Sequence, residues 1–525
     1  MSLDQIDRTL RLLDATPDWQ ALCARLPDCD RETAEAILDA ANALATDRFA
    51  PYGAAADAQG CRIEQGRVIT PDGSADLWRA YADGGWLALD LPEAHGGAGL
   101  PIAMQAAMLP LFERHAMPFM MGAGATRAAA HLLAERAAPA LAAEWVPQLA
   151  SGAWAATICI SEPGAGSDVG RIRTKAVPEG DDWRITGEKI WISFGDHDLT
   201  DRIGHCLLAR TNEQAGTRGL SLFLVPSTYE SAPNGVSVLR IEEKMGLHGS
   251  PTCALSFENA KGVMIGEEGR GLVQLFTMIE LMRLQTGCQG LGLATMACEV
   301  AEAYAQERTQ GGKPTAPPVP IAQHAGVAKT LAHMRATTEA LRAASLELAA
   351  SLDASRAGDA AAGSFASWLL PLFKTFGGET AITCADAGIQ VLGGAGYTRE
   401  WPLERALRDA RITTIYEGTT GIQALDFLTR RLWRDRSGLD AFLARVSFDG
   451  PHAQAAQTAV ASFADLATEL AQPDDARLGA AEPFMRAGWL AVCAWLGQRL
   501  DPREAAPLYA QLPERMALLR AQCLG

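Results

Sequence analysis

The hydrophobic pattern of this chain changes twice, and this change limits the possible folds more than any other feature. Between about residues 155 and 266, apolar residues recur with the period of two that is typical of β-strands, and Gly, Asp and Asn separate the short segments. On both sides, apolar residues recur at the three- and four-residue spacing of helices. No ten-residue helical pattern lies between the strands, which disfavours a parallel sheet built of strand–helix–strand units. The sequence therefore predicts an α+β fold with a central antiparallel β domain.

The same pattern divides the chain into four predicted domains. Residues 1–154 form an N-terminal helical domain, 155–266 the β domain, 267–436 a C-terminal helical bundle and 437–525 a small helical tail. Inside the bundle, the proline-rich stretch 313–320 cannot continue a helix. Two long helical patterns follow it, at roughly residues 322–355 and 364–388. With 525 residues, the chain is long enough to bury several hydrophobic cores.

Composition excludes some classes of function and indicates a compartment. The chain has 46 basic and 62 acidic residues, a net charge of −16, which disfavours nucleic-acid binding because phosphates need a basic surface. Its 11 cysteines include no CxxC pair, which predicts reduced thiols, no metal site and a cytoplasmic location. No apolar run approaches 18 residues and the N-terminus has no secretory pattern, so we expect no transmembrane segment.

Three glycine- or aromatic-containing motifs have both an ordinary and a functional interpretation. Residues 158–168 (ICISEPGAGSD) lack the third glycine of a dinucleotide fingerprint, and alone they indicate a turn after a strand. Residues 189–193 (KIWIS) place Trp191 and Ser193 on one face of a strand, where the indole either fills a core or stacks on a flat ring. Residues 388–397 (GIQVLGGAGY) end a helix in glycines, whose N–H groups can also hold a phosphate.

A fourth motif, residues 411–423 (RITTIYEGTTGIQ), is the most informative. Thr419 or Thr420 suits the N-cap of a helix, so Glu417 lies in an apolar approach just before that helix. The ordinary interpretation is a carboxylate stabilised by the helix dipole. Apolar surroundings would instead raise the pKa of the carboxyl group and make it a base near neutral pH.

In this order, the four motifs resemble the acyl-CoA dehydrogenase family. The resemblance covers about residues 80–435, and the matching segments are 161–168, 190–193, 246–249, 390–396, 408–412 and 415–419. Residues 196–201, 243–248 and 289–293 are similar to the branch with a C-terminal extension, which includes 3-methylmercaptopropionyl-CoA dehydrogenases and some long-chain enzymes. One departure is visible, since residues 307–312 read ERTQGG where many relatives have an aromatic residue.

The resemblance implies a role for each matching residue. Glu417 would abstract the α-proton of an acyl-CoA thioester, and the flavin of FAD would accept the β-hydride. The residues implied to bind FAD are Cys159, Ser161, Trp191, Ser193, Arg308, Gln390, Gly394, Thr419 and Gly421. Of these, Arg308, Gln390 and Gly394 would reach the FAD of a neighbouring subunit. The residues implied to contact acyl-CoA are Ser167, Glu280, Arg283 and Gly418.

The resemblance also implies an electron-transfer flavoprotein as electron acceptor and a homodimer or homotetramer as the assembly. Two alternatives are an acyl-CoA oxidase, which returns the electrons to oxygen, and a non-catalytic or DNA-associated flavoprotein that keeps only the fold. The presence of Glu417 and the acidic charge disfavour the non-catalytic alternative. A peroxide assay separates the oxidase from the dehydrogenase.

Overall fold

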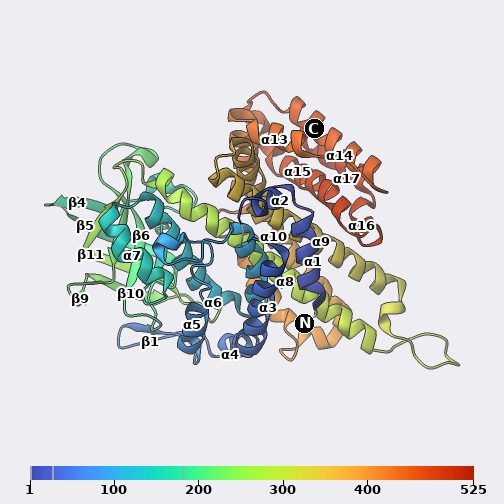
Figure 1. Ribbon diagram of the computed structural model, residues 1–525, viewed down its shortest axis with the longest axis horizontal. Helices are drawn as coiled ribbons and strands as arrows, with labels where there is room; N and C mark the ends of the chain where they lie inside the picture. The colour runs from blue at the N-terminus through green and yellow to red at the C-terminus, as the bar shows by residue number, and fades with distance from the viewer. Residues whose placement is uncertain (1–2, 27–28, 181) are drawn as a thin grey trace. The chain divides into compact units, whose positions relative to one another are not determined.

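A computed structural model of the chain describes residues 3–26, 29–180 and 182–525 (Figure 1). The chain forms two compact units. The first unit consists of Met1–Asn42, Pro101–Arg114 and Arg283–Gly525, and the second of Ala43–Leu100 and His115–Met282. Helices α6 (Ile102–Arg136) and α8 (Gly271–Glu307) contribute residues to both units.

The second unit contains the predicted β domain. Its seven-stranded sheet has the order β10-β11-β5-β4-β6-β3, and β7 pairs with β11 and β6. All pairings are antiparallel except those of β6 with β3 and with β4. The strands are β3 (Ala155–Cys159), β4 (Lys175–Glu179), β5 (Asp182–Ser193), β6 (Ile203–Arg210), β7 (Leu220–Pro226), β10 (Val236–Ile241) and β11 (Thr252–Ile265).

Helices and two small hairpins complete the second unit. The hairpins pair β1 (Arg62–Glu64) with β2 (Arg67–Ile69), and β8 (Thr228–Tyr229) with β9 (Ala232–Pro233). The helices that lie wholly in this unit are α4 (Ala50–Gln59), α5 (Ser74–Asp83) and α7 (Pro139–Ala150). One hydrophobic core joins α7 and part of α6 to the sheet, and it includes Leu132, Trp145 and Leu222. β7 is buried along its whole length, which explains its continuous apolar run.

The first unit is all helical in its described residues. It contains α1 (Leu3–Asp14), α2 (Pro17–Cys23), α3 (Arg31–Leu44), α9 (Ala325–Arg356), α10 (Ala360–Leu392), α11 (Leu403–Ala410), α12 (Thr420–Leu428), α13 (Ser437–Arg445), α14 (Ala453–Glu469), α15 (Ala481–Leu496), α16 (Pro502–Tyr509) and α17 (Leu512–Leu524). The two long helical regions predicted on either side of residue 360 are α9 and α10. The predicted α+β class, with helices before and after a β domain, is confirmed.

Glycines allow α8 and α10 to cross at backbone contact. A Cβ atom at Gly290 of α8 would lie 2.1 Å from the carbonyl oxygen of Gly377 on α10, and one at Gly287 would lie 2.1 Å from the ring of Phe373. On the next residue of α10, a Cβ at Gly378 would lie 2.4 Å from the hydroxyl of Thr413, just before the loop that contains Glu417. These contacts fix α8, α10 and that loop against one another.

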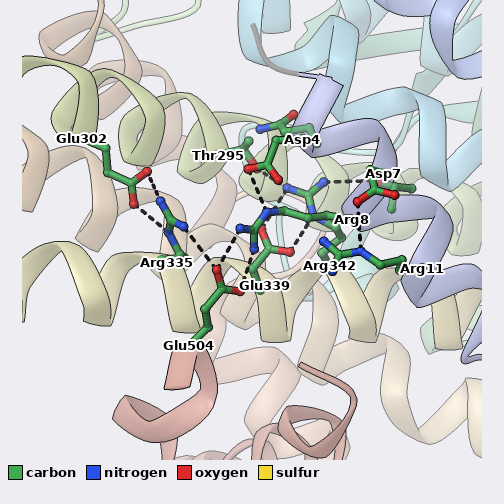
Figure 2. A network of polar contacts seen from close by, with 12 residues as sticks. Asp4, Asp7, Arg8, Arg11, Thr295, Glu302, Arg335, Glu339, Arg342 and Glu504 are labelled. Carbon is green, nitrogen blue, oxygen red and sulfur yellow. Dashed lines mark hydrogen bonds and ion pairs between the residues drawn. The ribbon is translucent and has the colours of Figure 1, made fainter. Parts of the chain in front are cut away.

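The tail after residue 436 is helical, as predicted, and belongs to the first unit. Phe442 of α13 stacks on Trp368 of α10 with 4.7 Å between ring centroids. Figure 2 shows a second attachment, in which Glu504 of α16 accepts two hydrogen bonds of 2.8 Å from Arg8 of α1 and one of 3.2 Å from Arg335 of α9. The tail therefore packs against the other helices of the first unit through both aromatic and ionic contacts.

None of the helices in the described part of the chain combines the length and the apolar character that crossing a membrane requires. The described residues also contain no cluster of three or more His, Cys, Asp and Glu side chains that could hold a metal ion.

Candidate functional site

The loop between η7 (Arg411–Thr414) and α12 holds Glu417 in an unusual backbone conformation. Glu417 has φ 55° and Gly418 has φ 93°, so two consecutive residues are left-handed. A left-handed conformation costs a residue with a Cβ atom about 1–2 kcal/mol and persists only where neighbours enforce it. Thr419 caps α12 by accepting a hydrogen bond of 3.3 Å from the N–H of Ile422, which is one of the two caps expected from the sequence.

Three side chains from three different helices hold the carbonyl groups of this loop. Arg283 Nε of α8 and Gln423 Nε2 of α12 donate to the Glu417 carbonyl oxygen at 3.2 and 2.8 Å. Lys374 Nζ of α10 donates to the Gly418 carbonyl oxygen at 2.7 Å. Both carbonyl groups are thereby fixed. Among the described residues, none accepts a hydrogen bond from the N–H of Glu417, so this donor is available to a ligand.

Burial and neighbouring charges shift the pKa values of the ionisable groups around the loop. Burial raises the pKa of Glu417, and the cations Arg283 and Lys374 oppose that rise. Burial lowers the pKa of Lys374 to about 7, against the effect of the Glu417 charge. Burial also lowers the pKa of Arg283. Glu417 is therefore a carboxyl group that is more basic than an ordinary glutamate and is influenced by two nearby cations.

A polar network joins the partly buried Tyr416, next to Glu417, to three buried side chains. Tyr416 Oη donates to Gln289 Oε1 of α8, and Gln285 Nε2 donates to Glu113 Oε1 of α6 at 2.8 Å. Gln289 also hydrogen-bonds Glu113. Glu113 is fully buried, and its burial raises its pKa well above the usual value. Its Oε2 atom has no hydrogen-bond partner among the residues that the structure describes.

The side chains of Ile415, Ile422 and Leu425 give the loop an apolar surface, since 37–47% of each is exposed. A basic carboxyl group, a free N–H donor and apolar surroundings suit one kind of chemistry. In such an arrangement, an N–H can polarise a carbonyl oxygen while a carboxylate removes a proton from the adjacent carbon.

A second group of predicted residues comes together in the β domain. Ile190 N, next to Trp191, donates to the Ser161 carbonyl oxygen at 2.9 Å, and Thr157 Oγ1 donates to the Ser193 carbonyl oxygen at 2.7 Å. β3, which ends at the buried Cys159, and the turn that follows it therefore lie beside the end of β5.

Trp191 is exposed and has a left-handed backbone conformation, which the local sequence does not predict. Its φ is 63°, and 59% of its surface is exposed. The register between β5 and β11 shifts here, because Ile192 pairs with Cys253 and Lys189 with Leu255. This bulge interrupts the alternation of side chains along the strand. An exposed indole on a fixed backbone is a stacking surface for a flat ring.

Three predicted residues lie far along α8 and α10 from the side chains that contact the Glu417 loop. Gln390 is sixteen residues beyond Lys374 on α10, roughly 24 Å at the rise of a helix, and Gly394 follows the end of that helix. Arg308 comes directly after α8, about 37 Å along that helix from Arg283 by the same measure.

Thr419 and Gly421 lie at the start of α12, and a Cβ atom at Gly421 or Gly394 would meet nothing within 4 Å. In the second unit, Ser167 is exposed in the loop after β3, and Glu280 is partly buried on α8.

Sequence reasoning missed Lys374, Gln423 and Glu113. The only signal for Lys374 is a lysine within an otherwise apolar helical stretch, residues 368–376. Because its contact with Gly418 spans 44 residues, the packing of α10 against the loop is needed to find it.

Comparison with known proteins gives consistent matches over most of the chain. Residues 31–153, 157–260 and 269–432 match the N-terminal, middle and C-terminal domains of acyl-CoA dehydrogenase, respectively. The chain is 38% identical over 425 residues to 3-methylmercaptopropionyl-CoA dehydrogenase of Ruegeria pomeroyi, an alignment that covers 78% of this chain and 72% of that protein.

Two further matches extend the comparison. The broad-specificity linear acyl-CoA dehydrogenase FadE5 of Mycobacterium tuberculosis is 36% identical over 402 residues, with 70% of this chain and 64% of that protein covered. A solved acyl-CoA dehydrogenase from Bacillus anthracis, complexed with FAD, has a TM-score of 0.76 at 23% identity and covers 94% of this chain and 87% of that one. The structural match establishes a shared fold that extends into the tail.

Proposed function

The chain belongs to the acyl-CoA dehydrogenase family and is an FAD-dependent oxidoreductase, and we propose that Glu417 is the base that removes the α-proton of its acyl-CoA substrate. When bound, FAD supplies the acceptor for the β-hydride. The family and the cofactor predicted from the sequence are confirmed. The role of each site residue is the part that we propose.

Features of the β domain support the fit of a flavin ring. Trp191 presents its indole on a left-handed bulge, and the turn at Cys159 and Ser161 is hydrogen-bonded to the same strand. Ser193 lies at the end of that strand, with its carbonyl group held by Thr157. We propose that these residues hold the flavin, and that Thr419 and Gly421 contact it beyond Glu417.

The deprotonation step places specific demands on the loop. A thioester α-hydrogen is a weak acid, so its carbonyl oxygen needs a hydrogen-bond donor while the proton leaves. The N–H of Glu417 has no acceptor among the described residues and is the donor that we assign. The Glu417 carboxylate then takes the proton, and its raised pKa makes it a stronger base than an exposed glutamate. The observation that carries this proposal is the left-handed turn at Glu417, whose carbonyl groups are held by three side chains while its N–H has no acceptor among the described residues.

Residues far from Glu417 support an assembly of several subunits. Arg308 and Gln390 lie tens of ångströms along α8 and α10 from Arg283 and Lys374, the residues that contact the Glu417 loop, and Gly394 follows α10. We therefore propose that these three residues bind the FAD of a neighbouring subunit in a homodimer or homotetramer. We further propose that Ser167, Glu280, Arg283 and Gly418 line the path of acyl-CoA. An electron-transfer flavoprotein is the proposed acceptor, and the cytoplasmic location stays a prediction.

The substitution Glu417→Gln tests the proposed base. We expect the variant to retain yellow FAD but to lose at least about 10²-fold in the rate of anaerobic flavin bleaching by acyl-CoA, because the amide cannot accept the proton. The measurement is stopped-flow absorbance with a panel of short, long, branched and sulfur-containing acyl-CoAs. Glu267→Gln, on an exposed side chain, is the control that should bleach at the native rate.

Bleaching of Glu417→Gln at the native rate by every substrate would refute the role of Glu417. Peroxide formed in proportion to turnover in air would favour the oxidase alternative. Absence of bleaching in the native protein with the whole panel would favour the non-catalytic flavoprotein.

A further inference from the structure

Lys374 is a buried cation in the middle of α10. Its side chain has no exposed surface, and it is among the largest fully buried side chains in the described part of the chain. A buried ammonium group loses its hydration, so it needs a strong acceptor and a nearby negative charge. The Gly418 carbonyl oxygen, 2.7 Å away, is the acceptor, and Glu417 supplies the charge.

The position of Lys374 on α10 makes it a rigid support for the loop. Its Nζ holds the second of two left-handed residues, whereas Arg283 and Gln423 hold the first. Three residues farther along α10, Gly377 contacts α8 backbone to backbone. Movement of Lys374 relative to Arg283 would therefore require the two helices to separate.

Lys374 is also the cation near Glu417 whose charge changes in the neutral range. The charged groups that act on Lys374 are Glu417 and Arg283. Arg283 in turn faces Glu417 and Asp426 and is repelled by Arg430 and Arg431. Arg283 keeps its charge because a guanidinium group does not deprotonate in proteins. The pKa of Lys374, by contrast, is lowered to about 7.

We propose that Lys374 is a positioning residue for the Glu417 base. Its ammonium group holds the Gly418 carbonyl, which fixes the turn that leaves the N–H of Glu417 free for a ligand, and its charge favours the ionised form of the Glu417 carboxyl. The proposal rests on the proposed role of Glu417 as the base. Lys374 lies outside all four sequence motifs, so none of them predicts this function.

The sign of the pH effect follows from the charge. Removal of a nearby positive charge raises the pKa of a carboxyl group, by roughly one unit or more for a partner within a few ångströms. Glu417 would then be protonated over a wider acid range. The acid limb of the pH–rate profile for flavin reduction should shift to higher pH by about one unit in a variant that lacks the charge.

Three substitutions at Lys374 separate the hydrogen bond from the charge. Lys374→Met removes both, Lys374→Gln keeps a donor without a charge, and Lys374→Arg keeps both. Lys329→Gln, an exposed lysine on α9, is the matched control. The measurements are FAD content, thermal unfolding, the dissociation constant for acyl-CoA and the rate of anaerobic flavin reduction from pH 5.5 to 9.

We expect FAD-loaded Lys374→Met to reduce its flavin about 10-fold or more slowly at pH 7, because small misplacements of reacting groups are costly. Its acid limb should shift upward while the dissociation constant for acyl-CoA changes less than about threefold, in line with a residue that acts through Glu417. Lys374→Gln should share the shift and recover part of the rate at high pH. Lys374→Arg should restore the native limb.

Two results would overturn the inference. One is a native acid limb in both uncharged variants. The other is a loss of rate that follows FAD content or thermal stability alone, which would assign Lys374 a structural role. If Lys374→Met does not fold, the comparison of Lys374→Gln with Lys374→Arg gives the same test. An inactive Glu417→Gln together with native Lys374 variants refutes only this inference, whereas an active Glu417→Gln refutes the proposed function itself.

Discussion

At the scale of single residues, the proposed site depends on two groups whose backbone conformation or pKa differs from that of the same residue exposed to solvent. Glu417 is left-handed and its pKa is raised, and Lys374 is a buried cation with a lowered pKa. The charges of Glu417 and Lys374 stabilise each other, and the Gly418 carbonyl oxygen accepts a hydrogen bond from Lys374. This combination makes Glu417, the proposed base, more basic than an exposed carboxylate.

Glu113 offers a residue-scale prediction about stability. Its folded-state pKa is raised well above the usual value, mainly by burial, so the folded protein binds a proton that the unfolded chain releases near pH 4.5. Stability should therefore fall as the pH rises from that value toward the folded-state pKa. Glu113→Gln removes this proton linkage and keeps an amide in place of the neutral carboxyl group.

We expect urea unfolding to show native-like stability of Glu113→Gln at pH 5 and a growing advantage of the variant over the native protein up to pH 8. The exposed Glu267→Gln should show no such trend. An equal pH dependence of the native protein and Glu113→Gln would mean that Glu113 is ionised in the folded state.

At the scale of elements, the crossing of α8 and α10 aligns the two cations with the loop. Gly290 lies where a Cβ atom would overlap the Gly377 carbonyl at 2.1 Å. Gly290→Ala should therefore destabilise the protein by about 1–3 kcal/mol through overpacking, and it should slow flavin reduction because Arg283 and Lys374 move apart.

Gly326→Ala is the control, because a Cβ atom at this α9 position meets nothing within 4 Å and alanine favours a helix. Urea unfolding and stopped-flow reduction measure both variants. Native stability of Gly290→Ala would show that the helices accommodate the added methyl group without cost. It would contradict the claim that the crossing of α8 and α10 aligns Arg283 and Lys374 with the loop.

At this scale, the sequence predicts features that depend on neighbouring residues but not those that depend on tertiary packing. Local signals were enough for the long helices on either side of residue 360 and for the cap at Thr419, since spacing and capping chemistry are properties of neighbouring residues. The bulge at Trp191 escaped prediction because it depends on the register with β11. The partnership of Lys374 with Gly418 escaped for the same reason, since it exists only after α10 has packed against the loop.

At the scale of the whole molecule, family membership and cofactor could be recognised from ordered motifs, whereas the four-part division of the chain stays a prediction. The helical tail is bound to the bundle by the stacked rings of Phe442 and Trp368 and by the hydrogen bonds of Glu504 to Arg8 (Figure 2). These contacts explain why the tail and the bundle form one compact unit. The proposed chemistry depends on one loop, the one that contains Glu417.

The most direct test of that loop separates proton abstraction from hydride transfer. An acyl-CoA without a β-hydrogen, such as 3,3-dimethylbutyryl-CoA, can lose an α-proton to the base but cannot transfer a hydride to the flavin. Exchange of its α-hydrogens with deuterium oxide, followed by NMR, therefore reports on the base alone. We predict exchange by the FAD-loaded native protein and a rate at least about 10²-fold lower for Glu417→Gln, whereas equal exchange by the two proteins would contradict the assignment of Glu417 as the base.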